Sequence, residues 1–224
     1  MEQNNIESLD DLSKLLGAEV YKKQGSIMIY VGGIPQISHS NDIVGNSLQE
    51  WLPAWFSDNG LDLTPNKHTQ AFPDFMAHFK NENIPMDIKC WNFNAPPAFD
   101  IANFDSFYRT TYTNPEKITA KYLVIGYKPN EHGFTIEYVD LKDLWELLGK
   151  TKTKPMNLPV KQGKTYAIRP INFRKPENAF NDVEEMLKAI KATRDQYPNK
   201  DLGYTSDDWF EKVSSHLKTI GLLK

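Results

Sequence analysis

The stretch FPDFMAHFKNENIPMDIKCW, residues 72–91, contains two short apolar segments on either side of a polar turn. Both segments predict neighbouring β-strands, because their apolar residues alternate with polar ones or run together over the length of a strand. Residues two apart on a strand point to the same face of a sheet. Asp87 and Lys89 should therefore project together, and a hairpin between the strands would bring Asp74 beside Asp87.

This arrangement has a chemical interpretation and a purely structural one. Two carboxylates and the backbone carbonyl between Asp87 and Lys89 form a hard oxygen site that suits Mg²⁺ with several retained waters. The ammonium group of Lys89 would then lower the pKa of a metal-bound water or balance charge on an attacked phosphate. The structural alternative is a proline turn at Asp74 and a surface strand that carries a local ion pair.

The rest of the chain predicts a mixture of helices and strands. Strands are expected at 26–33, 120–129, 133–141 and 163–173. Helices are expected at 7–16, 41–60, 99–118, 140–148, 178–197 and 205–223, the second of them interrupted or ended near Pro53. Ser8 and either Thr205 or Ser206 are the expected helix caps. This order favours an α/β or α+β fold with a mixed β-sheet flanked by helices.

The pattern P-D-x12-D-I-K resembles the PD-(D/E)xK motif of Mg²⁺-dependent nucleases, a superfamily that includes many type II restriction endonucleases. The resemblance implies that Asp74 and Asp87 are catalytic metal ligands and that Lys89 is the catalytic lysine, on adjacent strands of a mixed sheet. Many members also carry a Glu on a preceding helix, which binds metal or holds the site together. Glu50 in GNSLQEWL is the candidate for this role, with an ordinary exposed helix carboxylate as the alternative.

Five further segments (VGNSLQEWL, FPDF, DIKCWNF, FDIANFDSFY and YAIRPINF) are similar to the NgoBV-type restriction enzymes, whose members read GGNNCC. The resemblance implies Mg²⁺-dependent hydrolysis of double-stranded DNA at a specific short sequence by a homodimer. It also implies a host DNA methyltransferase that acts on the same site. Residues 1–224 are then a single nuclease domain of restriction-endonuclease-like fold, with a catalytic core at about 41–130.

Charge is distributed unevenly along a chain whose net charge is only −3. Residues 147–176 contain eight basic residues and no acidic one, which favours a DNA-contacting segment at about 150–175 over a merely solvated loop. Arg169 lies among apolar residues, so it could pair with guanine in the major groove or with a core carboxylate. Three asparagines could contact DNA or simply cap helices and turns. The candidate DNA-binding residues are Arg169, Lys150, Lys152, Lys154, Lys161, Lys164, Asn92, Asn94 and Asn103.

Several other classes of protein are disfavoured. A single cysteine excludes an internal disulfide, and the five histidines lack the spacing of a zinc site. Neither a membrane span nor a signal peptide is found, so we expect a cytoplasmic protein without membrane contact. Two alternative functions remain. A structure-specific repair or recombination nuclease would use the same motif, whereas a non-catalytic DNA-binding module would use only the basic segment.

Overall fold

The computed structural model describes residues 6–66, 72–172 and 174–224, which form two compact units. The first unit comprises Met1–Pro96 and Ala120–Lys142, and the second comprises Pro97–Thr119 and Asp143–Lys224. The expected catalytic residues all lie in the first unit. The expected basic segment lies in the second.

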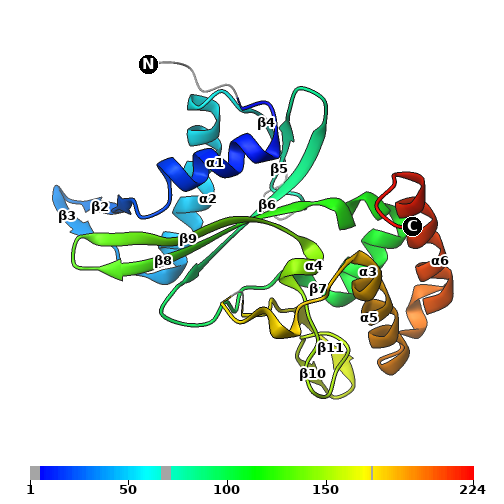
Figure 1. The fold of residues 1–224 in the computed structure, drawn as a ribbon. Coiled ribbons are helices and arrows are strands. Elements are labelled where there is room, and N and C mark those ends of the chain that lie inside the picture. Colours follow the sequence, from blue (N-terminus) through cyan, green and yellow to red (C-terminus); the bar gives the residue numbers. More distant parts are fainter. Residues whose placement is uncertain (1–5, 67–71, 173) are drawn as a thin grey trace. The chain divides into compact units, whose positions relative to one another are not determined.

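A six-stranded mixed sheet organises the first unit, with the strand order β1-β9-β8-β6-β5-β4 (Figure 1). The strands are β1 (Gln24–Gly25), β4 (Asp62–Pro65), β5 (Phe75–His78), β6 (Asn83–Asn92), β8 (Lys121–Asn130) and β9 (Gly133–Asp143). Strand β6 runs parallel to β8 and antiparallel to β5. The expected strand pair at 72–93 and the expected strands at 120–129 and 133–141 are therefore confirmed.

Helices α1 (Leu9–Glu19) and α2 (Asn41–Asp58) supply apolar side chains to a single core with the sheet. Leu48 and Leu52 of α2 belong to the same buried cluster as Met86 and Ile88 of β6. Strand alternation places Asp87 and Lys89 on the opposite face of β6. Helix α2 continues through Pro53 to Asp58, so the proline does not end the helix.

The strand expected at 26–33 is one arm of a small hairpin. Strand β2 (Met28–Val31) pairs antiparallel with β3 (Ile34–Ile37) in a separate two-stranded sheet. Gly32 and Gly33 form the turn with φ of 59° and 80°, a region that glycine enters without a steric penalty.

The second unit is mainly helical. Its helices are α3 (Phe104–Thr113), α4 (Leu144–Leu147), α5 (Val183–Gln196) and α6 (Ser206–Thr219), with short 3₁₀ helices at Pro115–Thr119, Pro176–Asn178 and Lys200–Leu202. The second unit also contains two pairs of very short strands. In these pairs β7 (Ala102–Asn103) lies beside β12 (Ala167–Ile168), and β10 (Val160–Lys161) lies beside β11 (Lys164–Thr165). Ser8 caps α1 and Thr205 caps α6, as expected.

Strand formation changed three of the expected elements. The helix expected from Phe99 begins at Phe104, because residues 102–103 pair with β12 and Asn103 caps the helix. The helix expected at 140–148 is reduced to Leu144–Leu147, because residues 140–143 continue β9. The strand expected at 163–173 is divided into β11 and β12, and its last residue lies outside the described residues.

A buried guanidinium group links α3 to α5 within the second unit. Arg194 is 5% exposed and forms an ion pair with Asp105, whose other carboxylate oxygen accepts a hydrogen bond from Asn199. The guanidinium also lies 4.8 Å from the ring centroid of Phe104 and 4.6 Å from that of Tyr108. A charge removed from water in this way needs its partner, because an unpaired buried ion is strongly destabilising.

We therefore expect Asp105→Ala to lower the free energy of unfolding by about 3 kcal/mol, since it leaves Arg194 buried without its carboxylate. Urea denaturation measures the change. Lys188→Gln is the control, because it breaks the exposed Lys188–Glu184 pair on α5 and should leave stability nearly unchanged. Equal stability of the two variants would contradict the structural role of Asp105.

Candidate active site

Asp74 lies immediately before β5, where its backbone and its side chain each accept a hydrogen bond. Its carbonyl accepts a hydrogen bond from the amide of Asn66 at 3.0 Å, which extends the pairing of β4 with β5. Its Oδ2 accepts a hydrogen bond from the backbone amide of Ile88 at 2.7 Å. The side chain thereby spans from the start of β5 to β6, next to Asp87.

Asp87 and Lys89 project from the same face of β6, as the strand periodicity predicts. Lys89 Nζ lies 2.8 Å from Asp87 Oδ2, and only 18% and 6% of the two side chains are exposed. On the neighbouring parallel strand, Tyr122 is in register with Asp87 and is fully buried. The ion pair is therefore largely shielded from solvent, unlike an ordinary surface pair.

Burial dominates the electrostatics of these residues. Burial raises the pKa of Asp87 to about 6, the nearby Lys89 opposes this shift, and the Asp74 carboxylate adds to it. Burial and the two carboxylates also raise the pKa of Tyr122 well above its usual value, so its phenol stays neutral. Two carboxylates with one ammonium leave an excess of negative charge that a bound cation would compensate.

Helix α2 contacts β6 through a different residue from the one expected. The side chain of Glu50 is exposed. Its neighbour Gln49 instead donates a hydrogen bond from Nε2 to the carbonyl oxygen of Ile88 at 2.8 Å. Gln49 was not among the residues expected at the site, because it and Glu50 are adjacent polar residues of one helix and no local pattern distinguishes them.

The donor set fits a hard divalent cation. Asp74, Asp87 and the Ile88 carbonyl offer only oxygen atoms, and Mg²⁺ commonly uses one or two carboxylates while it retains several waters. Within the described residues, no group of three or more His, Cys, Asp or Glu side chains could hold a metal ion. A cation at this position would therefore rely on water and substrate for its remaining ligands.

Cys90 does not contribute a nucleophile. Burial raises the pKa of its thiol to about 12, so the thiolate is not populated at neutral pH. The side chain packs against the hydrophobic core of the first unit, as expected for a small apolar group.

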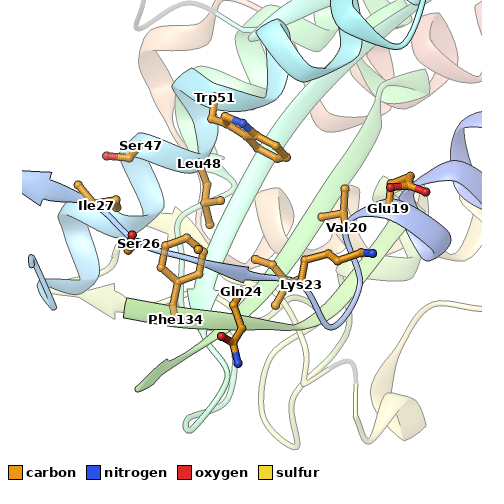
Figure 2. Close-up of a pocket in the computed structure, with 12 residues that line it drawn as sticks. Glu19, Val20, Lys23, Gln24, Ser26, Ile27, Ser47, Leu48, Trp51 and Phe134 are labelled. Carbon is orange, nitrogen blue, oxygen red and sulfur yellow. The ribbon is translucent and has the colours of Figure 1, made fainter. Parts of the chain in front are cut away.

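A pocket of about 330 Å³ lies elsewhere in the first unit, between the end of α1, α2 and the strands β1 and β9 (Figure 2). Leu48 and Trp51 of α2 line it together with Val20 and Phe134. None of the expected catalytic residues is among its lining residues. The pocket is thus separate from the carboxylate pair.

A sequence model of the NgoBV restriction endonuclease family matches residues 6–221. The chain belongs to this family. It is 32% identical over 223 residues to the type II restriction enzyme NlaIV of Neisseria lactamica. This alignment covers 96% of this chain and 88% of that enzyme. It is also 31% identical over 147 residues to the type II restriction enzyme NgoBV of Neisseria gonorrhoeae, across 65% of this chain and 81% of the relative.

A solved structure supports the same conclusion. The NlaIV restriction endonuclease superimposes with a TM-score of 0.83 at 26% sequence identity and covers 96% of this chain and 90% of its own. The expected family and the α+β fold with a mixed sheet are thereby confirmed. As a member of the NgoBV family, the protein is a type II restriction endonuclease, a site-specific deoxyribonuclease that acts on double-stranded DNA. No helix among the described residues is long and apolar enough to cross a bilayer.

The lysines expected to bind DNA in this family member differ in their surroundings. Lys150 forms an ion pair with Glu185 at 3.3 Å, and Lys154 donates to the carbonyl of Leu158 at 2.8 Å. The remaining three are exposed and have no acidic partner within the described residues: Lys152, Lys161 and Lys164. Lys152 and Lys164 remain available for phosphate. Lys161 Nζ also lies 5.6 Å from the ring centroid of Tyr166, and Lys150 and Lys154 would first have to give up a protein partner.

Arg169 is fixed by a surface carboxylate. Its Nε lies 2.9 Å from Asp100 Oδ1, and its guanidinium also donates to the carbonyl of Ala98. The side chains of Arg169 and Asp100 are 38% and 58% exposed. The pair is therefore not the core ion pair considered from the sequence, and part of the guanidinium still faces solvent.

Two of the three asparagines use their side chains in local structure. Asn92 Oδ1 accepts a hydrogen bond from the amide of Asn94 at 3.0 Å in the turn after β6. Asn103 caps α3 by accepting from the amide of Ser106 at 3.1 Å. These contacts are the turn and cap alternatives, and the exposed side chain of Asn94 remains a candidate for DNA contact.

Cation binding to the carboxylate pair can be measured without DNA. A cation that binds only the folded protein, present at about 100 times its dissociation constant, should stabilise it by about 2.7 kcal/mol. We expect Ca²⁺ to raise the melting temperature of the wild type and to have little effect on Asp87→Asn, which loses a ligand charge. Thermal denaturation with and without Ca²⁺ tests this, with Glu131→Gln, a change to an exposed carboxylate in the β8–β9 turn, as control. An equal Ca²⁺ response in Asp87→Asn would place cation binding elsewhere.

Proposed function

We propose that this restriction endonuclease hydrolyses both strands of a short specific DNA sequence through a Mg²⁺ site formed by Asp74, Asp87 and the Ile88 carbonyl, with Lys89 as the catalytic lysine. The observation that carries the proposal is the juxtaposition of Asp74, bonded to the Ile88 amide, with the buried Asp87–Lys89 pair. Glu50 is retained as a supporting carboxylate at the exposed side of α2.

When bound, Mg²⁺ would polarise the phosphodiester and lower the pKa of an attacking water. The two aspartates would hold the cation, and their fixed positions, just before β5 and on β6, would orient it relative to the scissile phosphate. The oxygen of water would form a bond to phosphorus and give up a proton as the bond to the 3′ oxygen breaks, and the departing oxygen would take up a proton. The products are a 5′-phosphate and a 3′-hydroxyl.

Lys89 would serve this reaction through its charge. Its ammonium is held 2.8 Å from Asp87 and is mostly shielded from water, so its field at a neighbouring phosphate is less screened than that of a surface lysine. The group would offset negative charge that develops on the phosphate in the transition state.

The proposed partners follow from the reaction. A symmetric DNA site is most simply read by a two-fold symmetric homodimer in which each subunit cuts one strand. The exposed lysines of the 150–175 segment would contact phosphates, and the exposed part of Arg169 would face a base or phosphate. A methyltransferase that modifies the same sequence would protect host DNA in the cytoplasm.

Digestion of a sequenced plasmid with Mg²⁺ tests the activity. We expect discrete fragments for the wild type, with the termini located by end sequencing. Asp74→Asn, Asp87→Asn and Lys89→Ala should each abolish cleavage and remain folded, because they remove a cation ligand or the catalytic charge. Glu50→Ala should only raise the Mg²⁺ requirement. A smear of fragments would favour a structure-specific nuclease, and binding without cleavage would favour a DNA-binding module.

The DNA-contacting lysines can be tested by the salt dependence of binding, measured with Ca²⁺ to prevent cleavage. Neutralising Lys152, Lys161 and Lys164 to Gln should flatten the slope of log affinity against log salt by about one unit for each phosphate that the protein no longer neutralises. The matched control neutralises three exposed lysines outside the segment, Lys14, Lys200 and Lys218. The same slope in both triple variants would remove the segment from the DNA interface.

A further inference from the structure

The backbone of Ile88 is held by side chains on both of its polar groups. Its amide donates to Asp74 Oδ2 at 2.7 Å, and its carbonyl accepts from Gln49 Nε2 at 2.8 Å. The pairing of β5 with β6 ends at Phe75 and Met86, so these two groups lie just past the last paired residue. The amide of Ile88 is thus held by a residue at the start of β5, and its carbonyl by a residue of α2.

The rotation of α2 decides which of its side chains reaches this point. Leu48 and Leu52 are buried against the sheet and fix the helix face. Gln49 follows Leu48 and reaches the strand backbone, whereas Glu50, a further 100° around the helix, is exposed. The contact is also chemically specific, because an amide nitrogen donates to a carbonyl and an ionised carboxylate cannot.

We propose that Gln49 is a positioning residue that orients the Ile88 carbonyl toward the cation held by Asp74 and Asp87. This inference rests on the proposed function of that site. A carbonyl oxygen has two lone pairs, and the amide of Gln49 occupies one of them, which leaves the other for a cation. Gln49 acts through Ile88 and touches neither the cation nor the substrate.

Three variants separate this role from simple helix packing. Gln49→Met keeps the length of the side chain but cannot donate a hydrogen bond. Gln49→Glu places a carboxylate oxygen where the donor was, so it also loses the bond. Asn46→Ala is the matched control, because it removes an exposed amide from the same helix.

Two measurements are made on each variant. Calorimetry gives the affinity for Ca²⁺ in the absence of DNA. Cleavage of a plasmid substrate at increasing Mg²⁺ separates the half-saturating Mg²⁺ concentration from the turnover number. Loss of a group that orients a metal ligand weakens metal binding by about 10- to 100-fold. We expect Gln49→Met and Gln49→Glu to lose at least about tenfold in Ca²⁺ affinity and to need correspondingly more Mg²⁺, with turnover largely recovered at saturation.

The carbonyl ¹³C chemical shift of Ile88 checks the hydrogen bond itself in metal-free protein, and it should change in both Gln49 variants but not in Asn46→Ala. Two results would overturn the inference. One is Ca²⁺ affinity in Gln49→Met equal to that in Asn46→Ala, with only stability or turnover reduced. The other is tighter Ca²⁺ binding in Gln49→Glu, which would make residue 49 a direct ligand. Failure of the proposed function is distinct, because the wild type itself would then not cleave or Asp87→Asn would remain active.

Discussion

The proposed active site depends on the point at which the pairing of two strands ends. Strands β5 and β6 are paired only as far as Phe75 and Met86, and a buried peptide group without a hydrogen bond is costly. Side chains therefore take over the bonding of Ile88, with Asp74 as acceptor and Gln49 as donor. The same requirement that completes the backbone hydrogen bonding brings a carboxylate next to Asp87. One contact thus meets a structural need and would also meet the proposed catalytic one.

The opposite side of β6 imposes a second constraint. Parallel pairing with β8 over Met86–Asn92 holds Asp87 in a position where its charge is removed from water. Burial raises the pKa of Asp87, the nearby Lys89 offsets this rise only in part, and the Asp74 carboxylate adds to it. A site with uncompensated negative charge in a shielded position is prepared for a cation. Rigid strands supply this preparation more accurately than a flexible loop would.

Much of this arrangement could be predicted from the sequence, because it depends on local periodicity. The alternation of residues 72–91 is sufficient to place Asp87 and Lys89 on one face and Asp74 at the start of the neighbouring strand. The choice between Gln49 and Glu50 could not be predicted in the same way. Both residues are polar, and only the tertiary packing of Leu48 and Leu52 fixes which of them turns toward β6. Likewise, pairing of residues 102–103 with 167–168 starts α3 at Phe104, and no local pattern reveals that contact.

The groups expected to contact DNA differ from one another in how firmly they are held. Arg169 is anchored by Asp100 and the Ala98 carbonyl, so little rotamer freedom remains to be lost on binding. Lys152 and Lys164 are exposed, and their contribution to phosphate binding would be electrostatic and sensitive to salt. An anchored, planar group suits the recognition of one position, because its hydrogen bonds have a fixed direction. Flexible point charges suit attraction to any duplex, because they need no particular geometry. Discrimination between sequences should therefore come from the few anchored groups, whereas the lysines set affinity for all DNA alike.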